Sequence, residues 1–380
     1  MYSERIQGES FWSSCIRLNQ PKHQMKKILL LILVSSVALS CFAKEKQFFK
    51  ANHPFIQYTG RVDYSNPLKP KFWASGAYVE IKFKGNYCAM KINDEMLWGN
   101  ILNYLEIKID DQPAYRIRLT GKENEVVLGK NLSDGVHRVM ICKNSEAENG
   151  YLEMVGFSCA ELLKPDPKPV RKMEFIGDSI TCGAGSDESE VKCGASGSSW
   201  HDQHNAYFAY GPTTARSLNA QWHLTSVSGI GLMHSCCEKK IVMPQVFAKT
   251  NFAKDTIDWD FKRYQPDVVT VCLGQNDGVQ DSIKFTDAYV KFAKQLRVYY
   301  PKAKLVLLSS PMANAKLKSV LVNYIGAVVN RLKAQGDKNI GSYFFTQQAR
   351  SGCGSHPSLA EHQQIAAELT TYLSKEMNWR

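Results

Sequence analysis

Residues 170–179 read Val-Arg-Lys-Met-Glu-Phe-Ile-Gly-Asp-Ser. The apolar run that ends at Ile176 predicts a short strand, and Gly177 predicts a tight turn directly after it. This arrangement is typical of open α/β sheets, in which reactive side chains lie at the carboxyl ends of the strands. We therefore expect the hydroxyl of Ser179 at such an edge, where it can act as a nucleophile.

A second apolar run ends in the same way about a hundred residues later. Residues 267–277 read Asp-Val-Val-Thr-Val-Cys-Leu-Gly-Gln-Asn-Asp. Gly274 frees the backbone after this predicted strand, so that the amide of Asn276 can enter the same crevice as Ser179. Asn-Asp-Gly is also common turn chemistry, which is the alternative interpretation of this block.

His356 is the candidate base. A serine needs a base to become a nucleophile, and a neutral histidine can take and return a proton near neutral pH. His356 and Pro357 lie in the loop before a predicted C-terminal helix, whose start is marked by a capping-box pattern from Ser358 to Glu361. Four of the remaining histidines are interpreted as surface or pocket-wall residues, namely His201, His204, His234 and His362.

The chain is long enough for two domains, which meet at a proline-rich linker. Prolines at 165, 167 and 169 cannot continue a helix or a central strand. Before the linker (164–170), residues 48–163 contain short runs that alternate apolar and polar residues, with turn residues between them. This pattern predicts an antiparallel β-sandwich of the jelly-roll kind. The clearest runs are 78–83, 104–109, 114–119 and 136–141.

Residues 171–380 have a different rhythm, in which short apolar runs alternate with amphipathic segments of helix length. This βαβ rhythm predicts a doubly wound parallel sheet in an α/β domain. Besides the strand before Ser179, the predicted strands are 221–227, 267–273, 304–309 and 342–346, and the predicted helices are 205–218, 286–299, 316–334 and 359–374.

Residues 1–43 form a predicted leader. From Met25, which we expect to be the true start, a basic beginning, a short apolar stretch and small residues follow, as in a secretory signal. The apolar stretch is shorter than the roughly 20 residues that span a bilayer. Cleavage after Ala43 would give a secreted or periplasmic protein, whereas processing before Cys41 would give a lipid-anchored one, and the sequence leaves both open.

Charge and cysteine content exclude some classes of protein. The net charge of +11 is spread among acidic residues without a dense basic run, so no nucleic-acid partner is expected. Nine cysteines lie beyond residue 43, without Cys-x-x-Cys or zinc-finger spacing, and neither a metal nor a cofactor is expected. Because nine is odd, at least one is unpaired. Cys182 and Cys193 flank a polar loop after Ser179, and we hypothesise that they form a disulfide.

The blocks around Ser179, Asn276 and His356 resemble the SGNH, or GDSL-type, hydrolase superfamily. The resemblance implies that His356 is the base, just before the final helix. It also implies an oxyanion hole of three donors. These are the backbone N–H of Ser179, the backbone N–H of Gly229 in Val-Ser-Gly-Ile-Gly (227–231), and the side chain of Asn276.

One position departs from this pattern. Many SGNH hydrolases carry an aspartate two or three residues before the histidine, where it orients the ring. In this chain those positions are Gly354 and Cys353. We predict either a Ser-His dyad steered by a backbone carbonyl or an acid supplied from elsewhere, and the resemblance favours the dyad.

The two-domain plan is similar to carbohydrate esterase family 2. Its traits recur in Thr-Gly-Arg-Val-Asp-Tyr-Ser-Asn-Pro (59–67), in Ile-Thr-Cys-Gly (180–183) and in Gly352-Cys353. That family includes members with incomplete triads and removes O-acetyl groups from plant polysaccharides such as xylan and glucomannan. The resemblance therefore implies an acetyl esterase that forms an acyl-enzyme and acts on an acetylated polysaccharide or oligosaccharide, and the leader predicts that it is exported.

Three aromatic residues of the second half are candidates for stacking on a sugar face, namely Trp200, Tyr210 and Trp259. The polar insert 183–204 is expected to form a wall of the cleft, because it follows Ser179 closely. A GDSL-type lipase or thioesterase would need an apolar lid or groove, which this insert does not provide. A third interpretation is a carbohydrate-binding protein without catalysis, since the orienting acid is missing. Glycan binding by the sandwich itself would rest on fold analogy.

Overall fold

The computed structural model describes residues 46–130, 132–252 and 256–379. The predicted leader, with Met25 and Cys41, lies outside the described residues. Residues from Lys46 onward form one unit. Among the residues described, no helix has the length and apolar character that crossing a membrane requires.

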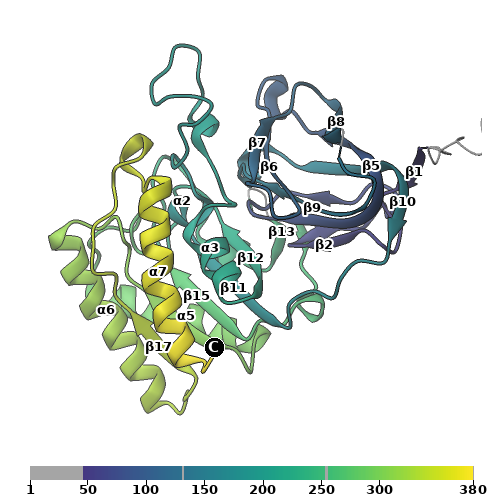
Figure 1. Cartoon of the computed structure of the whole chain (residues 1–380). Coiled ribbons are helices and arrows are strands. Elements are labelled where there is room, and N and C mark those ends of the chain that lie inside the picture. Colours follow the sequence, from purple (N-terminus) through teal and green to yellow (C-terminus); the bar gives the residue numbers. More distant parts are fainter. Residues whose placement is uncertain (1–45, 131, 253–255, 380) are drawn as a thin grey trace, which may run out of the picture. The chain divides into compact units, whose positions relative to one another are not determined.

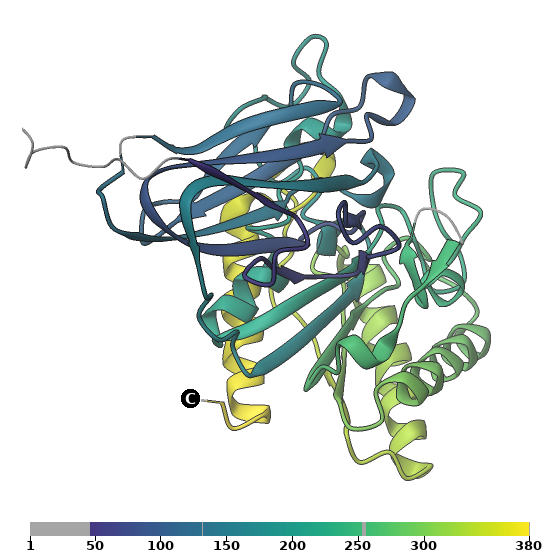
Figure 2. The same ribbon diagram turned by 90° about the vertical axis from the view of Figure 1, so that its right-hand side faces the viewer.

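The N-terminal half is built from antiparallel strands, as predicted. Among the described residues, ten strands form one sheet in the order β3-β4-β10-β5-β9-β6-β7, with β1 on β10, and β2 and β8 on β5. The sheet is curved (Figure 2). Their bounds are β1 Gln47–Lys50, β2 Gln57–Thr59, β3 Val62–Asp63, β4 Lys71–Phe72, β5 Tyr78–Asp94, β6 Tyr104–Ile109, β7 Tyr115–Arg118, β8 Glu123–Lys130, β9 Val136–Lys143 and β10 Leu152–Leu163.

Strand β5 runs far beyond its predicted end at residue 83. Its first part pairs with β9, and its second part pairs with β8 after Gly85, so one strand serves both regions of the sheet. The inward-facing side chains of the whole sheet bury a single apolar core that includes Phe83, Met90 and Phe157. The half thus stands on its own hydrophobic core, which is what makes a domain.

The C-terminal half is a five-stranded parallel sheet in the order β12-β11-β15-β16-β17 (Figure 1). The strands are β11 Arg171–Gly177, β12 Ala220–Ser226, β15 Val268–Cys272, β16 Lys304–Leu308 and β17 Ile340–Tyr343. The helices are α2 Ser179–Cys182, α3 Tyr210–Ser217, α4 Met243–Val246, α5 Ser282–Tyr299, α6 Ala315–Ala334 and α7 Leu359–Glu376. A small hairpin, β13 Lys249–Asn251 and β14 Thr256–Asp258, and short 3₁₀ turns at η1 Leu97–Gly99, η2 Ala147–Asn149, η3 Trp200–Gln203, η4 Phe261–Arg263 and η5 Cys353–Ser355 complete the fold.

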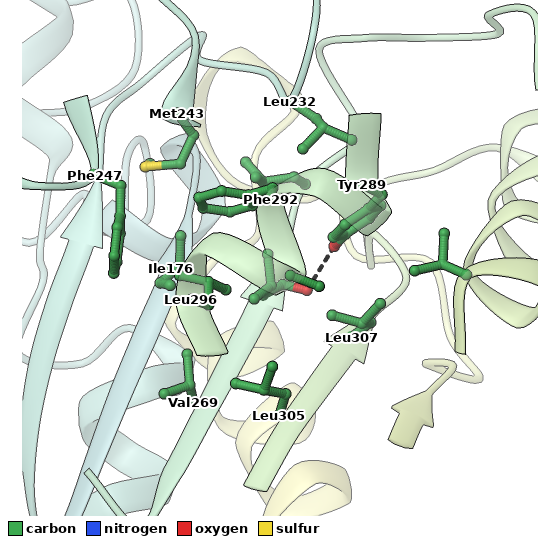
Figure 3. Close-up of a cluster of buried hydrophobic side chains, with 14 of the residues drawn as sticks. Ile176, Leu232, Met243, Phe247, Val269, Tyr289, Phe292, Leu296, Leu305 and Leu307 are labelled. Carbon is green, nitrogen blue, oxygen red and sulfur yellow. Dashed lines mark hydrogen bonds between the residues drawn. The ribbon is translucent and has the colours of Figure 1, made fainter. Parts of the chain in front are cut away.

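Helices cover both faces of the parallel sheet, so the predicted doubly wound architecture is confirmed. On one face, α5 packs Phe292 and Leu296 over Ile176, Val269 and Leu305 of three neighbouring strands (Figure 3). On the other face, α3 and α7 cover the same strands. The observed strands agree with the predicted ones to within a few residues, and the helix predicted over 205–218 begins later, at Tyr210.

The order of the parallel strands determines where the site lies. Strand β11 lies between β12 and β15, so the chain leaves β11 toward one side of the sheet and later returns on the other side. Ligand sites of open α/β sheets lie at this kind of switch point, outside the carboxyl ends of the strands. Ser179 follows β11 and Asn276 follows β15, which brings both to the switch point.

Candidate active site

Ser179 is the first residue of helix α2. Asp178 caps this helix by accepting a hydrogen bond from the backbone N–H of Ile180 at 3.0 Å. The N–H of Ser179 lies in the first turn, where no intrahelical acceptor exists, and it has no other partner among the described residues. The turn therefore presents both the hydroxyl and a free N–H of the same residue.

His356 contacts the nucleophile directly. Its Nε2 lies 2.8 Å from the Ser179 hydroxyl, and its Nδ1 lies 3.1 Å from the carbonyl oxygen of Gly354. Because a carbonyl only accepts, Nδ1 carries the proton and the lone pair of Nε2 faces Ser179. Burial lowers the pKa of His356, so that the ring is neutral near neutral pH. The carbonyl of Gly354 is therefore the group that orients the ring of His356, for which either a backbone carbonyl or an acid was expected.

Trp200 lies against the base. Its ring centroid is 5.0 Å from that of His356, and 38% of the residue is exposed. A side chain at Gly354 would collide with the indole, so the loop that carries the base needs glycine to pass Trp200. The structure thus brings Trp200 to His356, and part of its surface is available to a ligand.

The other two predicted aromatic contacts lie elsewhere. Tyr210 is fully buried in the core, where its hydroxyl lies 2.9 Å from that of Thr181, and it therefore has no surface for a sugar. Trp259 is 7% exposed and lines a separate cavity with Lys172 and Gln221, at the amino ends of the parallel strands. Both assignments to the substrate site are therefore wrong for this structure.

Gly229 lies in the loop after β12 with a free N–H. Its φ of +76° is in the left-handed region, which glycine adopts without strain. Its carbonyl accepts a hydrogen bond from the N–H of Cys236 at 2.9 Å, whereas its own N–H has no partner among the described residues. The loop therefore leaves one backbone donor unused, next to β11 and its serine.

The amide of Asn276 is shared between two acceptors. Its Nδ2 donates to the carbonyl of Ile230 at 2.8 Å and to the carboxyl of Asp178 at 3.3 Å. Burial raises the pKa of Asp178 to about 7, with a hydrogen bond from Ile180 acting against it and the charge of Asp277 in the same direction. The longer of the two bonds of Asn276 is the weaker one, and it is the one that an oxyanion could replace.

The predicted pairing of Cys182 with Cys193 is wrong. Cys193 forms a disulfide with Cys353, and Cys182 is a buried thiol 3.2 Å from the hydroxyl of Ser226. Cys182 lies on helix α2 and points into the interior, while the polar loop that carries Cys193 folds back toward the loop of the base. The prediction had relied on the short sequence separation between Cys182 and Cys193.

Glu146, from the N-terminal half, also reaches this region. Glu146, His201 and His204 place ligand-type atoms within 4.8 Å of one another, which is the pattern of a metal site. However, the N–H of Gly185 donates to Nδ1 of His204 at 3.2 Å. A neutral ring with a lone pair at Nδ1 carries its proton on Nε2, which lies 2.9 Å from Glu146. The group therefore fits an imidazole–carboxylate pair better than a cation.

Sequence reasoning missed Glu146 because it lies in the other half of the chain. The available signal was a polar run, Lys-Asn-Ser-Glu (143–146), which begins two residues after the predicted strand run 136–141, and all four residues are buried. His204 and His362, expected at the surface or on a pocket wall, are also buried. Polar residues that the fold buries cannot be recognised from apolar periodicity alone.

The site as a whole has the parts needed for acyl transfer. A hydroxyl is hydrogen-bonded to a neutral histidine, which is oriented by a carbonyl. Among the described residues, the N–H of Ser179 in helix α2 and the N–H of Gly229 in the loop after β12 have no acceptor, and the amide of Asn276 lies in the loop after β15. A nucleophile, a base and donors for a developing oxyanion are the roles that this reaction class requires.

Comparison with known proteins agrees with this geometry. Residues 58–169 match the family model for the N-terminal domain of carbohydrate esterase 2, and residues 175–345 match the GDSL-like Lipase/Acylhydrolase family. A solved family two carbohydrate esterase from Clostridium thermocellum, in complex with cellohexaose, superposes with a TM-score of 0.78 at 30% identity, covering 86% of this chain and all of that one.

Two curated relatives extend the comparison. The chain is 32% identical over 347 residues to cellulase/esterase CelE of Acetivibrio thermocellus. The match covers 89% of this chain but only 41% of that protein, so the chain spans less than half the length of this relative. It is 28% identical over 366 residues to an acetylxylan esterase / glucomannan deacetylase of Cellvibrio japonicus, covering 92% of this chain and 98% of the relative.

Proposed function

The chain belongs to carbohydrate esterase family 2, and from this premise we propose that it is a serine esterase that removes O-acetyl groups from polysaccharides. The observation that carries the proposal is the 2.8 Å hydrogen bond between Ser179 Oγ and His356 Nε2. A nucleophile and a base in this contact, next to free backbone donors, match the chemistry of ester hydrolysis.

Acylation begins with attack of Ser179 Oγ on the acetyl carbonyl carbon while His356 Nε2 takes the hydroxyl proton. The carbonyl oxygen becomes an oxyanion, which accepts from the N–H groups of Ser179 and Gly229 and from the amide of Asn276. Collapse of this intermediate breaks the bond to the sugar oxygen. The imidazolium returns its proton to that oxygen, so the sugar leaves as an alcohol and Ser179 carries the acetyl group.

Deacylation repeats these steps with water. His356 takes a proton from a water molecule, which attacks the acetyl carbon, and the same donors receive the second oxyanion. The bond between Ser179 Oγ and the acetyl carbon then breaks, Oγ takes back the proton held by His356, and acetic acid leaves and ionises to acetate in water. The carbonyl of Gly354 accepts from Nδ1 throughout, which keeps the ring in one orientation.

We place the substrate among acetylated plant polysaccharides, because the relative of matching length is named acetylxylan esterase / glucomannan deacetylase. Trp200 supports this choice, since its partly exposed indole lies beside the base. An aromatic ring of this kind can stack on a sugar while the acetyl ester reaches Ser179.

The proposed activity can be tested by measuring acetate release from acetylated xylan and acetylated glucomannan. The wild-type chain would be compared with Ser179→Ala and with Ser217→Ala, an exposed serine of helix α3 that serves as the control. We expect release by wild type and Ser217→Ala and its loss in Ser179→Ala. Faster cleavage of aryl hexanoate than aryl acetate would favour a lipase or thioesterase. A folded wild type without turnover of either ester would favour a binding protein.

We also propose that the protein is exported, on the basis of the secretory pattern of residues 25–43. Fractionation of producing cells would place it in the periplasm or medium, and Cys41→Ala would separate a lipid-anchored form from a free one. Retention of the intact chain in the cytoplasm would contradict export.

A further inference from the structure

We infer that Glu146, which the N-terminal half contributes, is a positioning residue that holds the oxyanion loop (residues 227–231) and places a buried negative charge near the base. The inference rests on the proposed function and deepens it. It makes the β-sheet domain a part of the active site rather than an attached module. None of the roles in the dyad or the oxyanion hole includes this residue.

The carboxylate of Glu146 binds the residue next to Gly229 at two points. The backbone N–H of Ser228 donates to Oε2 at 2.7 Å, and the hydroxyl of Ser228 donates to Oε1. A bidentate contact of this kind determines both the position and the orientation of the backbone at Ser228. The following peptide carries the N–H of Gly229, so its direction depends on Glu146.

The loop is held from the opposite side as well. The carbonyl of Gly229 accepts from the N–H of Cys236 at 2.9 Å. Gly229 therefore lies between a contact through Ser228 to the N-terminal half and a contact within its own half. Within the part of the chain that the structure describes, its N–H has no acceptor, as an oxyanion donor must have none before substrate binds.

Glu146 itself has little freedom to move. Lys143, which is fully buried, donates from Nζ to the carbonyls of Ser145 and Glu146 at 2.8 and 2.7 Å. Burial lowers the pKa of Lys143 to about 7. The hydroxyl of Ser145 donates to the side chain of Asn103 at 2.7 Å. The turn that carries Glu146 is thus fixed by its own side chains, and preorganisation of this kind is what a catalytic electrostatic contact requires.

The carboxylate is ionised. Burial alone would raise the pKa of Glu146, but the neighbouring ring of His204 and the two hydrogen bonds from Ser228 hold it well below the usual range. Burial lowers the pKa of His356, the carbonyl of Gly354 raises it, and the negative charge of Glu146 also raises it. When His356 becomes an imidazolium during acylation, Glu146 is thus a counter-charge in a chain that lacks the usual aspartate. It acts through space and not through a hydrogen bond to the ring.

Other titratable groups also lie near Glu146 and His356, on the elements that pack against these two residues. His204 is neutral in this arrangement; a second proton on its ring would lower the pKa of His356, which is the opposite of the effect of Glu146. Glu146 also interacts with Lys143 on β9, Glu148 on the same turn, His201 on η3, Cys182 on α2 and Asp178 at its cap, and His362 on α7 interacts with His356.

Two substitutions separate position from charge. Glu146→Gln keeps the size of the side chain and removes the charge. Its kcat on an aryl acetate should fall about 10- to 100-fold, short of the ~10²–10³-fold loss for a deleted oxyanion donor, with KM little changed. Because the lost charge had raised the pKa of His356, the acidic limb of kcat/KM should move to lower pH. Glu146→Asp keeps the charge and withdraws it from Ser228, so kcat should fall while the acidic limb stays.

Glu148→Gln is the matched control, because Glu148 lies on the same turn and pairs with Lys239 of the other half. It should leave kcat and the pH profile near wild type. If Glu146→Gln does not fold, as judged by circular dichroism and thermal unfolding, Ser228→Ala removes one of the two contacts and should lower kcat several-fold.

The outcomes separate the two proposals. If wild type cleaves the ester and Ser179→Ala does not, the esterase proposal stands. A folded Glu146→Gln with wild-type kcat and an unmoved acidic limb would then overturn the role of Glu146 alone. A wild type no more active than Ser179→Ala would overturn both.

Discussion

The disulfide between Cys193 and Cys353 joins the polar loop after the nucleophile to the loop that carries the base, with Cα atoms 5.5 Å apart. Cys353 occupies one of the two positions where many SGNH hydrolases carry the orienting aspartate. The carbonyl of the next residue, Gly354, accepts from His356 at 3.1 Å. The covalent link thus restrains the backbone that replaces a carboxylate.

We predict that Cys193→Ser combined with Cys353→Ser lowers both stability and activity. A native disulfide typically contributes about 2–4 kcal/mol to the free energy of unfolding. The kcat should fall because the carbonyl that orients His356 becomes mobile. Urea unfolding and kcat on an aryl acetate would measure the two effects.

A second variant controls for the neighbouring cysteine pair. Cys236 and Cys237 also form a disulfide, so a thiol reductant acts on both links. Cys236→Ser with Cys237→Ser should stay sensitive to reductant, whereas the Cys193/Cys353 variant should lose most of its response. Wild-type kcat and stability in the Cys193/Cys353 variant would contradict the role of this link.

This disulfide illustrates what the sequence could not predict. Its cysteines are 160 residues apart, and nothing in local spacing distinguishes Cys193–Cys353 from Cys182–Cys193. The parallel strands were predicted to within a few residues, because buried apolar runs bounded by glycine and charged residues are a local signal. Strand β5 was predicted too short, because Gly85 resembles a turn within a strand that continues.

Some residues of the candidate site could likewise be predicted from local sequence signals, and others could not. Ser179, Asn276 and His356 follow strands or precede a helix, so their positions could be predicted from order in the chain and the switch point of the sheet. Glu146 belongs to another domain and reaches the site only through tertiary packing. Tyr210 is a residue type that often stacks on sugars, but its position on helix α3 places the side chain in the core.

The pH dependence of the esterase follows from the burial of His356. Burial lowers its pKa, and only the neutral ring can accept the proton of Ser179. The kcat/KM should therefore rise with pH and reach half its plateau below the ordinary histidine value of about 6.5. A profile on an aryl acetate, from acidic to mildly alkaline pH, would test this. A midpoint above that value would contradict it.

Trp200 contributes to this burial, since its ring lies 5.0 Å from that of His356. Trp200→Ala should expose the imidazole to water and move the acidic limb of kcat/KM upward, toward the ordinary value. On polysaccharide, KM should also rise because an exposed stacking face is lost. Trp379→Ala, near the C-terminus, controls for the loss of an indole. An unmoved limb in Trp200→Ala would show that the indole does not shield the base.

The two halves share a buried ion pair whose loss should destabilise the protein. Arg61 of the N-terminal half lies 2.9 Å from Glu174 of β11, and both side chains are fully buried. Arg61→Met would leave Glu174 without its cation, and breaking such a pair costs about 3–5 kcal/mol. Urea unfolding would measure this loss. Arg331→Met, which removes an exposed pair with Asp287, should cost at most about 1 kcal/mol. Equal stability of the two variants would contradict the prediction.

Asn276→Ala tests the side-chain amide that donates both to the carbonyl of Ile230 and to the carboxyl of Asp178. Its amide would exchange the 3.3 Å bond to Asp178 for the oxyanion, a contact made only in the transition state. We therefore expect kcat to fall ~10²–10³-fold with little change in KM. Gln275→Ala is the matched control, because its side chain contacts Ser310 at 2.6 Å and not the site. A rise in KM at constant kcat would instead mean that Asn276 binds the ground state of the ester.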